Sequence, residues 1–167
     1  MSCVFSWVCA TSLSIIKMYL KQKGDDGAGR KRMSVEHIID HDARLIITAW
    51  TGAASEQSLA DALRNYQQTI KASRECQSYN ELLDFSLITD VELSARGMIA
   101  LSRLAQQSDR SDMWTRLALL VSSPLAFGLA KMYVAYRSLV PGSHKDLSVF
   151  RIRSDALAWL SADHVDS

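Results

Sequence analysis

Apolar and polar residues first alternate in a regular way from Val35 onward. The runs "VEHIID" (35–40) and "RLIITAW" (44–50) are rich in β-formers, and a short polar link separates them. Two such runs on either side of a short link predict a β-hairpin. We expect Gly52 to end the second strand.

The pattern then changes to helical spacing. Apolar residues recur at intervals of four, three and four, which is one face of an α-helix. Ser55 is suited to cap this helix, and we expect the helix to end near Ala72. Ser58 occupies the position where a capping box has Glu or Gln, so we expect that box to be incomplete. The residues of the apolar face are Leu59, Leu63, Tyr66 and Ile70.

Two further segments, 81–88 and 115–121, are almost continuously apolar. Such runs are typical of strands that are buried on both faces of a sheet. Between them, the spacing predicts a second helix over about 93–107. Its expected inner face contains Ala95, Met98, Leu101 and Ala105.

A third helix is predicted to follow the second buried strand. Ser123 is a good N-cap, and Pro124 takes the first helical position, where its missing N–H costs nothing. A last strand is expected at 147–152, and Ser154 is expected to cap a closing helix with Asp155 in its first turn. The stripe expected to face inward on the third helix is Leu125, Leu129, Met132, Tyr136 and Leu139.

The predicted order of elements is therefore β-β-α-β-α-β-α-β-α. Strands that alternate with helices argue for an α/β fold with right-handed crossovers. We expect a sheet of four or five strands, mostly parallel or mixed, with about four helices.

The first 32 residues differ from the rest. Residues 1–16 carry no charge, and 21–32 have the composition of a linker. Three interpretations remain open: an over-extended start with Met33 as the true first residue, a weak membrane anchor within 1–20, or an extra helix. A spanning helix needs about 20 apolar residues, which this segment does not reach. We treat 1–32 as an N-terminal extension and 33–167 as the domain.

Composition excludes some function classes. An apolar share of 48% fits a globular protein, and a net charge of +1 gives no general attraction to nucleic acid. The extension carries net +4, so the remainder is mildly acidic at −3. Three cysteines without a CxxC pair indicate neither disulfides nor a zinc site, which favours a reducing compartment and a cytoplasmic location.

The order of elements, together with residues 81–101, resembles the STAS domain of bacterial anti-sigma-factor antagonists and sulfate-transporter tails. It is more similar still to small bacterial STAS-like proteins that are likened to CRAL-TRIO lipid-transfer domains. The ending "SVFRIRSDALAWL" is similar to the usual ending of that branch, and the resemblance covers about 35–162. It implies a regulatory or interaction module.

In the antagonists, a "D-L-S" strand is followed by "D-S-S-G" at a helix start, where one serine is phosphorylated. Residues 84–86, "DFS", match the strand part, and the next four family positions fall on 92–95, "ELSA". The usual acceptor position is then Leu93, which has no hydroxyl. Ser94 is left as the phospho-switch candidate, although a helix N-cap is the favoured role for it.

Other chemistry is sparse. His37, Asp40, His41 and Asp42 are zinc-ligand types, but "DHD" is typical of a solvated turn, and we expect no metal. No G-x-S-x-G, P-loop or G-x-G-x-x-G motif is present, so we expect no catalytic residue, no cofactor and a non-enzymatic role.

The third helix carries soft and aromatic side chains that are candidates for a groove: Phe127, Met132, Tyr133 and Tyr136. The leading hypothesis is a STAS-like module that binds a protein partner or a small apolar ligand. The alternative is a lipid-binding or membrane-associated protein that uses the helix 124–139 and the apolar front segment. A homodimer is also left open.

Overall fold

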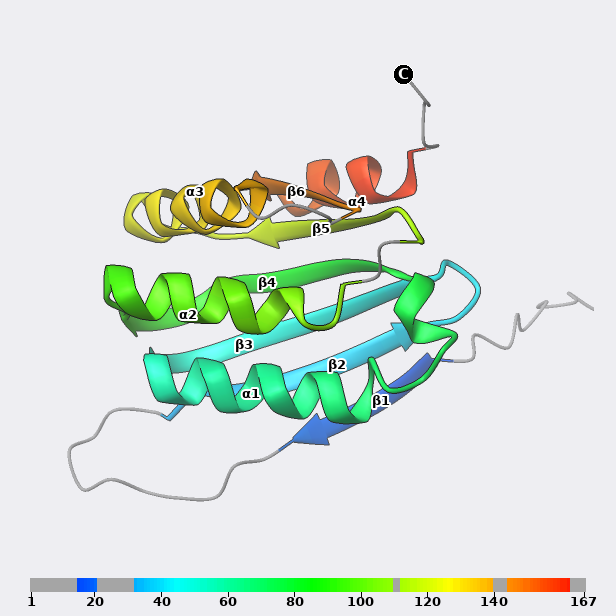
Figure 1. Cartoon of the computed structure of the whole chain (residues 1–167), viewed down its shortest axis with the longest axis horizontal. Helices are drawn as coiled ribbons and strands as arrows, with labels where there is room; N and C mark the ends of the chain where they lie inside the picture. Colours follow the sequence, from blue (N-terminus) through cyan, green and yellow to red (C-terminus); the bar gives the residue numbers. More distant parts are fainter. Residues whose placement is uncertain (1–14, 21–31, 110–111, 140–143, 163–167) are drawn as a thin grey trace, which may run out of the picture.

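The computed structural model describes residues 15–20, 32–109, 112–139 and 144–162. Within them, the predicted order of strands and helices is confirmed, and one further strand precedes it (Figure 1). The strands are β1 (Ile15–Leu20), β2 (Ser34–Asp40), β3 (Leu45–Ser55), β4 (Asn80–Glu92), β5 (Thr115–Leu120) and β6 (Lys145–Phe150). The helices are α1 (Glu56–Thr69), the short 3₁₀ turn η1 (Cys76–Ser78), α2 (Ala95–Gln106), α3 (Pro124–Ser138) and α4 (Arg153–Ser161).

The strands form one mixed sheet in the order β1-β2-β3-β4-β5-β6. β2 and β3 form the expected antiparallel hairpin, whereas β3 through β6 run parallel. β1 pairs antiparallel with β2, which gives six strands where four or five were expected. Residues 15–20 are thus a strand, and not the extra helix that the sequence left open. The domain boundary at residue 33 stays a prediction.

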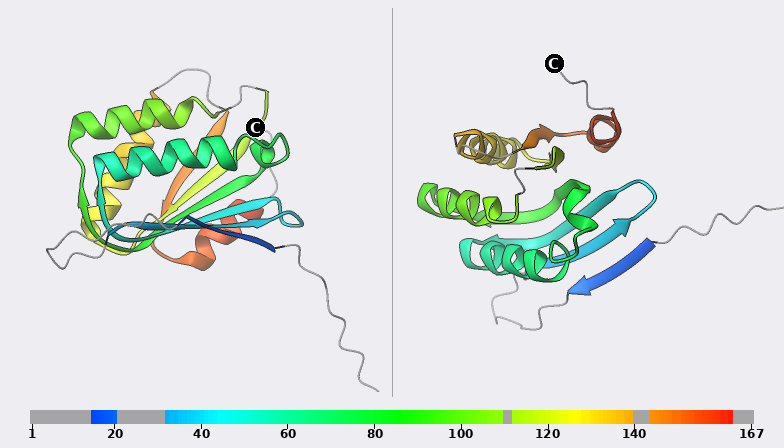
Figure 2. Two further views of the ribbon diagram at one scale, coloured as in Figure 1. Left: turned by 90° about the horizontal axis from the view of Figure 1, so that it is seen from below. Right: turned by 45° about the vertical axis from the view of Figure 1, so that its right-hand side comes forward.

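Helices cover the two faces of the sheet unequally. α1, α2 and α3 lie on one face, and α4 lies on the other (Figures 1 and 2). Side chains on β3 alternate between buried and half-buried positions, as expected for a strand with one strongly covered face. Beneath α4, Leu82 and Leu120 pack against Ala156 and Leu160.

Two strands are longer than the sequence indicated. Gly52 was expected to end its strand, but β3 continues to Ser55 with Gly52 inside it at φ 84°. The pairing of β3 with β4 shifts register next to this glycine, and a residue without Cβ adopts such a positive φ at little cost. β4 likewise runs on to Glu92.

The helix caps also differ in detail from the expectation. The capping box of α1 is complete, because the Ser58 hydroxyl accepts a hydrogen bond from the Ser55 N–H at 2.9 Å, as a Glu would. α4 begins at Arg153 with Ile152 as its N-cap, so Ser154 does not cap it, although Asp155 lies in the first turn as predicted. Ser123 caps α3 and Pro124 begins it, as expected.

The inward face of α3 was predicted wrongly at three of its five positions, whereas Leu129 and Tyr136 are half-buried. Leu125 and Leu139 are 71% and 76% exposed, and Met132 is exposed as well. The buried residues of this helix are instead Ala130 and Arg137. α3 is apolar around most of its circumference, so the spacing of its larger side chains could not decide which face meets the sheet.

Candidate apolar binding site

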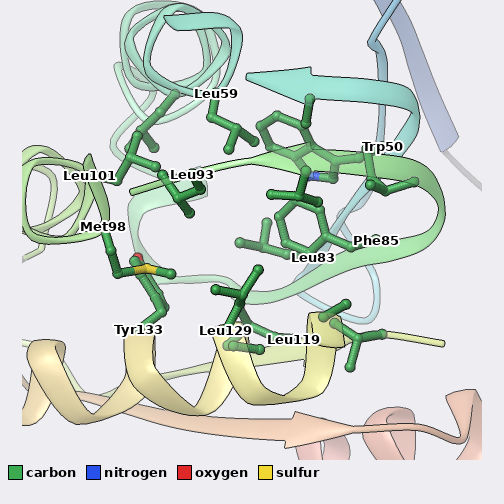
Figure 3. A pocket seen from close by; sticks show the side chains of 17 residues that line it. Trp50, Leu59, Leu83, Phe85, Leu93, Met98, Leu101, Leu119, Leu129 and Tyr133 are labelled. Carbon is green, nitrogen blue, oxygen red and sulfur yellow. The ribbon is translucent and has the colours of Figure 1, made fainter. Parts of the chain in front are cut away.

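A pocket of about 140 Å³ lies between the sheet and the three helices α1, α2 and α3 (Figure 3). Its lining comes from β3, β4, β5 and all three helices, so segments distant in the sequence build it together. Seventeen side chains line it, and fifteen of them carry no polar atom. The ten labelled in Figure 3 are Trp50, Leu59, Leu83, Phe85, Leu93, Met98, Leu101, Leu119, Leu129 and Tyr133.

Small, branched and aromatic residues bound the pocket. α3 contributes Ala126 and Ala130 as well as the larger Leu129 and Tyr133. On the sheet, Trp50 stacks on Phe85 with ring centroids 5.1 Å apart, which forms a flat apolar wall. A pocket with such walls favours apolar ligands.

Two lining side chains do carry a polar atom. The indole Nε1 of Trp50 is buried and has no hydrogen-bond partner among the described residues, and Figure 3 shows it on the side of the ring next to Phe85. At the other end of the pocket, the Tyr133 hydroxyl lies beside Met98. Arg137 Nη1 donates a hydrogen bond to that hydroxyl at 3.3 Å. Burial raises the pKa of Tyr133, so it remains a neutral phenol.

Arg137 connects Tyr133 to a buried network of charges. Its guanidinium pairs with Asp109, and Lys145 Nζ lies 3.3 Å from the same carboxylate. Lys145 also pairs with Glu81 at 2.6 Å, and Lys71 pairs with Glu81 at 2.8 Å. The network therefore joins the first residues of β4 and β6 to the ends of α1 and α3.

Glu81 is the centre of this network and is 3% exposed. The Tyr66 hydroxyl donates a hydrogen bond to its other oxygen at 2.7 Å. Burial alone would raise the pKa of Glu81, but the ammonium groups of Lys145 and Lys71 outweigh it and hold the pKa well below its usual range. Glu81 is thus ionised near pH 7. Burial lowers the pKa of Lys71, and Glu81 opposes that shift.

The four residues predicted to form a groove lie in different places. Tyr133 lines the pocket, whereas Phe127 packs in the core between α3 and β5. Met132 lies on the exposed face of α3, and Tyr136 is half-buried on the same helix. The assignment of these residues to ligand binding stays a prediction.

Sequence reasoning missed the sheet side of the pocket. Trp50 and Phe85 lie near the middle of adjacent parallel strands. Aromatic residues inside apolar strands are typical of a core, so the pattern carried no signal of a pocket at these positions.

Ser94, the phospho-switch candidate, caps α2. Its hydroxyl accepts a hydrogen bond from Gly97 N–H at 3.1 Å. The carboxylate of Glu56 lies at the same helix terminus and accepts from Ser94 N–H at 2.7 Å. Hydrogen bonds from Ser94 hold the pKa of Glu56 below its usual value. An internal carboxylate thus already occupies the position where a helix N-terminus stabilises negative charge. Phosphorylation of Ser94 stays a prediction.

His37 lies in β2, away from the solvated turn with which it was grouped. It is 1% exposed, and its Nδ1 is 3.0 Å from the Thr48 hydroxyl. Burial lowers the pKa of His37 to about 4, so the ring is neutral near pH 7.

Among the described residues, no three His, Cys, Asp or Glu side chains gather as metal ligands do. Likewise, none of the helices in the described part of the chain has the length and apolar character to cross a membrane.

No protein-family model matches the chain, and no curated protein matches it. Among solved structures, the chain is similar to an uncharacterised protein from Shewanella loihica, described as a member of the DUF3478 family with a SpoIIAA-like fold. The two are 14% identical with a TM-score of 0.40, over 96% of this chain and 98% of that chain.

Proposed function

We propose that this protein is a non-enzymatic binding module that holds one small apolar molecule in the pocket between the sheet and α1–α3. The observation that supports this most is the lining: fifteen of seventeen side chains carry no polar atom. A ligand that fills the space removes the apolar lining from water, which is favourable by about 25 cal/mol per Å² of apolar surface buried.

The volume sets the size of the ligand. A dry cavity of about 150 Å³ lined by aliphatic and aromatic side chains takes up one benzene-sized molecule. The pocket here, at about 140 Å³, fits a single six-membered ring with a short substituent or a short alkyl chain.

A reducing location such as the cytoplasm is part of the proposal, and it is supported by Cys76, which is a buried free thiol.

The test is calorimetric titration of the full chain with α-methylstyrene, a single ring with a short apolar substituent. We expect saturable binding of one molecule per chain. Ala130→Leu extends a side chain into the pocket and should weaken binding at least tenfold. Ala135→Leu makes the same change on the exposed face of the same helix and should leave the affinity unchanged. Equal affinities for both variants, or no binding to the wild type, would refute the proposal.

A second candidate function concerns the outer face of α3. Leu125, Met132 and Leu139 recur every seven residues on this face, as residues at one position of a coiled-coil repeat do, and all three are exposed. This favours association with α3 of a second copy of the chain. Sedimentation of the wild type and of Leu125→Glu tests it: only the wild type should form a dimer.

A further inference from the structure

We infer that the ligand of this pocket carries a hydrogen-bond acceptor, such as a carbonyl oxygen, and that the indole N–H of Trp50 binds it. This inference rests on the proposed function and names the class of ligand. It follows from Trp50, whose indole nitrogen can only donate, and it is supported by Tyr133, whose hydroxyl can donate its proton.

Trp50 supplies the first part of the argument. Its side chain is 6% exposed, and its Nε1–H has no hydrogen-bond partner among the described residues. An indole nitrogen donates and cannot accept, so only an acceptor can satisfy it. Buried polar groups in folded proteins nearly always have a partner, and each exception requires an explanation. Trp50 lines the pocket, so an acceptor on the bound molecule provides that partner.

Tyr133 supplies the second part. Its hydroxyl oxygen already accepts a hydrogen bond from the Arg137 guanidinium, which leaves its proton to be donated. Both ends of the pocket therefore offer a hydrogen-bond donor to a ligand that carries an acceptor.

The indole nitrogen lies next to Phe85 and has almost no surface open to the pocket, so a ligand reaches the N–H only when the Phe85 ring moves aside (Figure 3). Water does not reach the N–H, and a single water molecule would find few partners among the surrounding apolar side chains. A ligand that enters beside Phe85 brings the acceptor and the apolar surface together. Its acceptor loses its own hydration on entry, so the hydrogen bond to Trp50 determines whether such a ligand is retained.

Two matched probes test this inference. Acetophenone and α-methylstyrene have nearly the same shape, but only acetophenone carries a carbonyl oxygen. In a ¹⁵N-resolved NMR titration of the full chain, the side-chain N–H of Trp50 should move downfield with acetophenone relative to its position with α-methylstyrene. Both rings cause similar ring-current shifts, so the difference between the probes reports the hydrogen bond.

A variant gives the energetic counterpart. Trp50→Phe retains an aromatic ring against Phe85 and removes the donor. We expect it to weaken acetophenone about five- to tenfold and to change α-methylstyrene less than twofold. Tyr133→Phe removes the hydroxyl group that also lines the pocket. If the affinity for acetophenone falls in that variant alone, the assignment to Trp50 is overturned. The NMR result on the wild type stands even where a variant does not fold.

The outcomes separate the inference from the proposed function. Failure of both probes to bind the wild type would remove the proposed function itself. A second outcome is that both probes bind with the same chemical shift of the Trp50 N–H and lose the same affinity in Trp50→Phe. That result would leave the pocket as a purely apolar site and overturn the inference.

Discussion

Replacement of Glu81 by Gln should destabilise the fold strongly, because it leaves two buried ammonium groups without their shared counter-charge. The carboxylate of Glu81 lies 2.8 Å from Lys71 Nζ and 2.6 Å from Lys145 Nζ, and all three side chains are almost fully buried. Glu81→Gln keeps the shape but removes the charge. Lys71 then keeps the Cys76 carbonyl at 3.0 Å, and Lys145 keeps Asp109 at 3.3 Å.

The magnitude follows from the geometry. Breaking a buried ion pair by removal of one partner costs about 3–5 kcal/mol, because the other charge is left buried and uncompensated. A domain has about 5–15 kcal/mol of stability in total, so the variant loses a large part of it. With a urea dependence of about 2 kcal/mol per molar, a loss of about 4 kcal/mol lowers the unfolding midpoint by about 2 M.

Urea unfolding followed by circular dichroism measures this shift. Glu75→Gln is the matched control: it makes the same change six residues upstream on an exposed carboxylate and should move the midpoint very little. A double variant, Glu81→Gln with Lys145→Met, removes one uncompensated ammonium and should recover part of the loss. A shift for Glu81→Gln as small as that of the control would show that water screens these charges and that the buried network does not exist as described.

Three further results are expected. The His37 ring binds a proton below about pH 6.5 in the unfolded chain, but only near pH 4 in the folded protein. Its contribution to the free energy of unfolding is therefore complete above pH 6.5 and declines by about 3 kcal/mol as the pH falls toward 4. An NMR titration that gives an ordinary pKa for His37 would contradict this. Gly97→Ala places a Cβ in collision with the carboxyl group of Glu56, so the carboxylate must move off Ser94. The pKa of Glu56 should then rise toward its usual value in a carbon-detected titration, and an unchanged pKa would contradict the contact. Leu125→Glu should leave the free energy of unfolding within about 0.5 kcal/mol of wild type, because the residue is 71% exposed. A loss of several kcal/mol would show that Leu125 is buried in the core.

The sequence predicted the order of elements because each strand and helix has its own period. The burial of Glu81 and Lys145 could not be predicted in the same way, since their partners are far apart in the chain. Glu81 is near the start of β4 and Lys145 begins β6, two strands on either side of β5. The first residues of parallel strands lie at one edge of the sheet, so opposite charges at these two positions were the available signal.

His37 and α3 show opposite failures of pattern reasoning. His37 shares its strand face with Val35 and Ile39, and strict alternation would have placed it in the core had it not been grouped with the polar turn that follows. For α3, the pattern was followed and was misleading. Leu125, Met132 and Leu139 are exposed, whereas the small residues Ala126 and Ala130 line the pocket. A preference for small side chains on the buried face cannot be recognised from hydrophobicity alone.

The central claim is that a small apolar molecule enters the space between the sheet and α1–α3, and methyl-resolved NMR tests it most directly. On addition of α-methylstyrene, the methyl signals of Met98 and Leu129, which line the pocket, should shift in a saturable manner. Those of Leu87 and Leu125, which are 65% and 71% exposed, should stay in place. Shifts confined to the exposed leucines, or no saturable shift at all, would contradict the account.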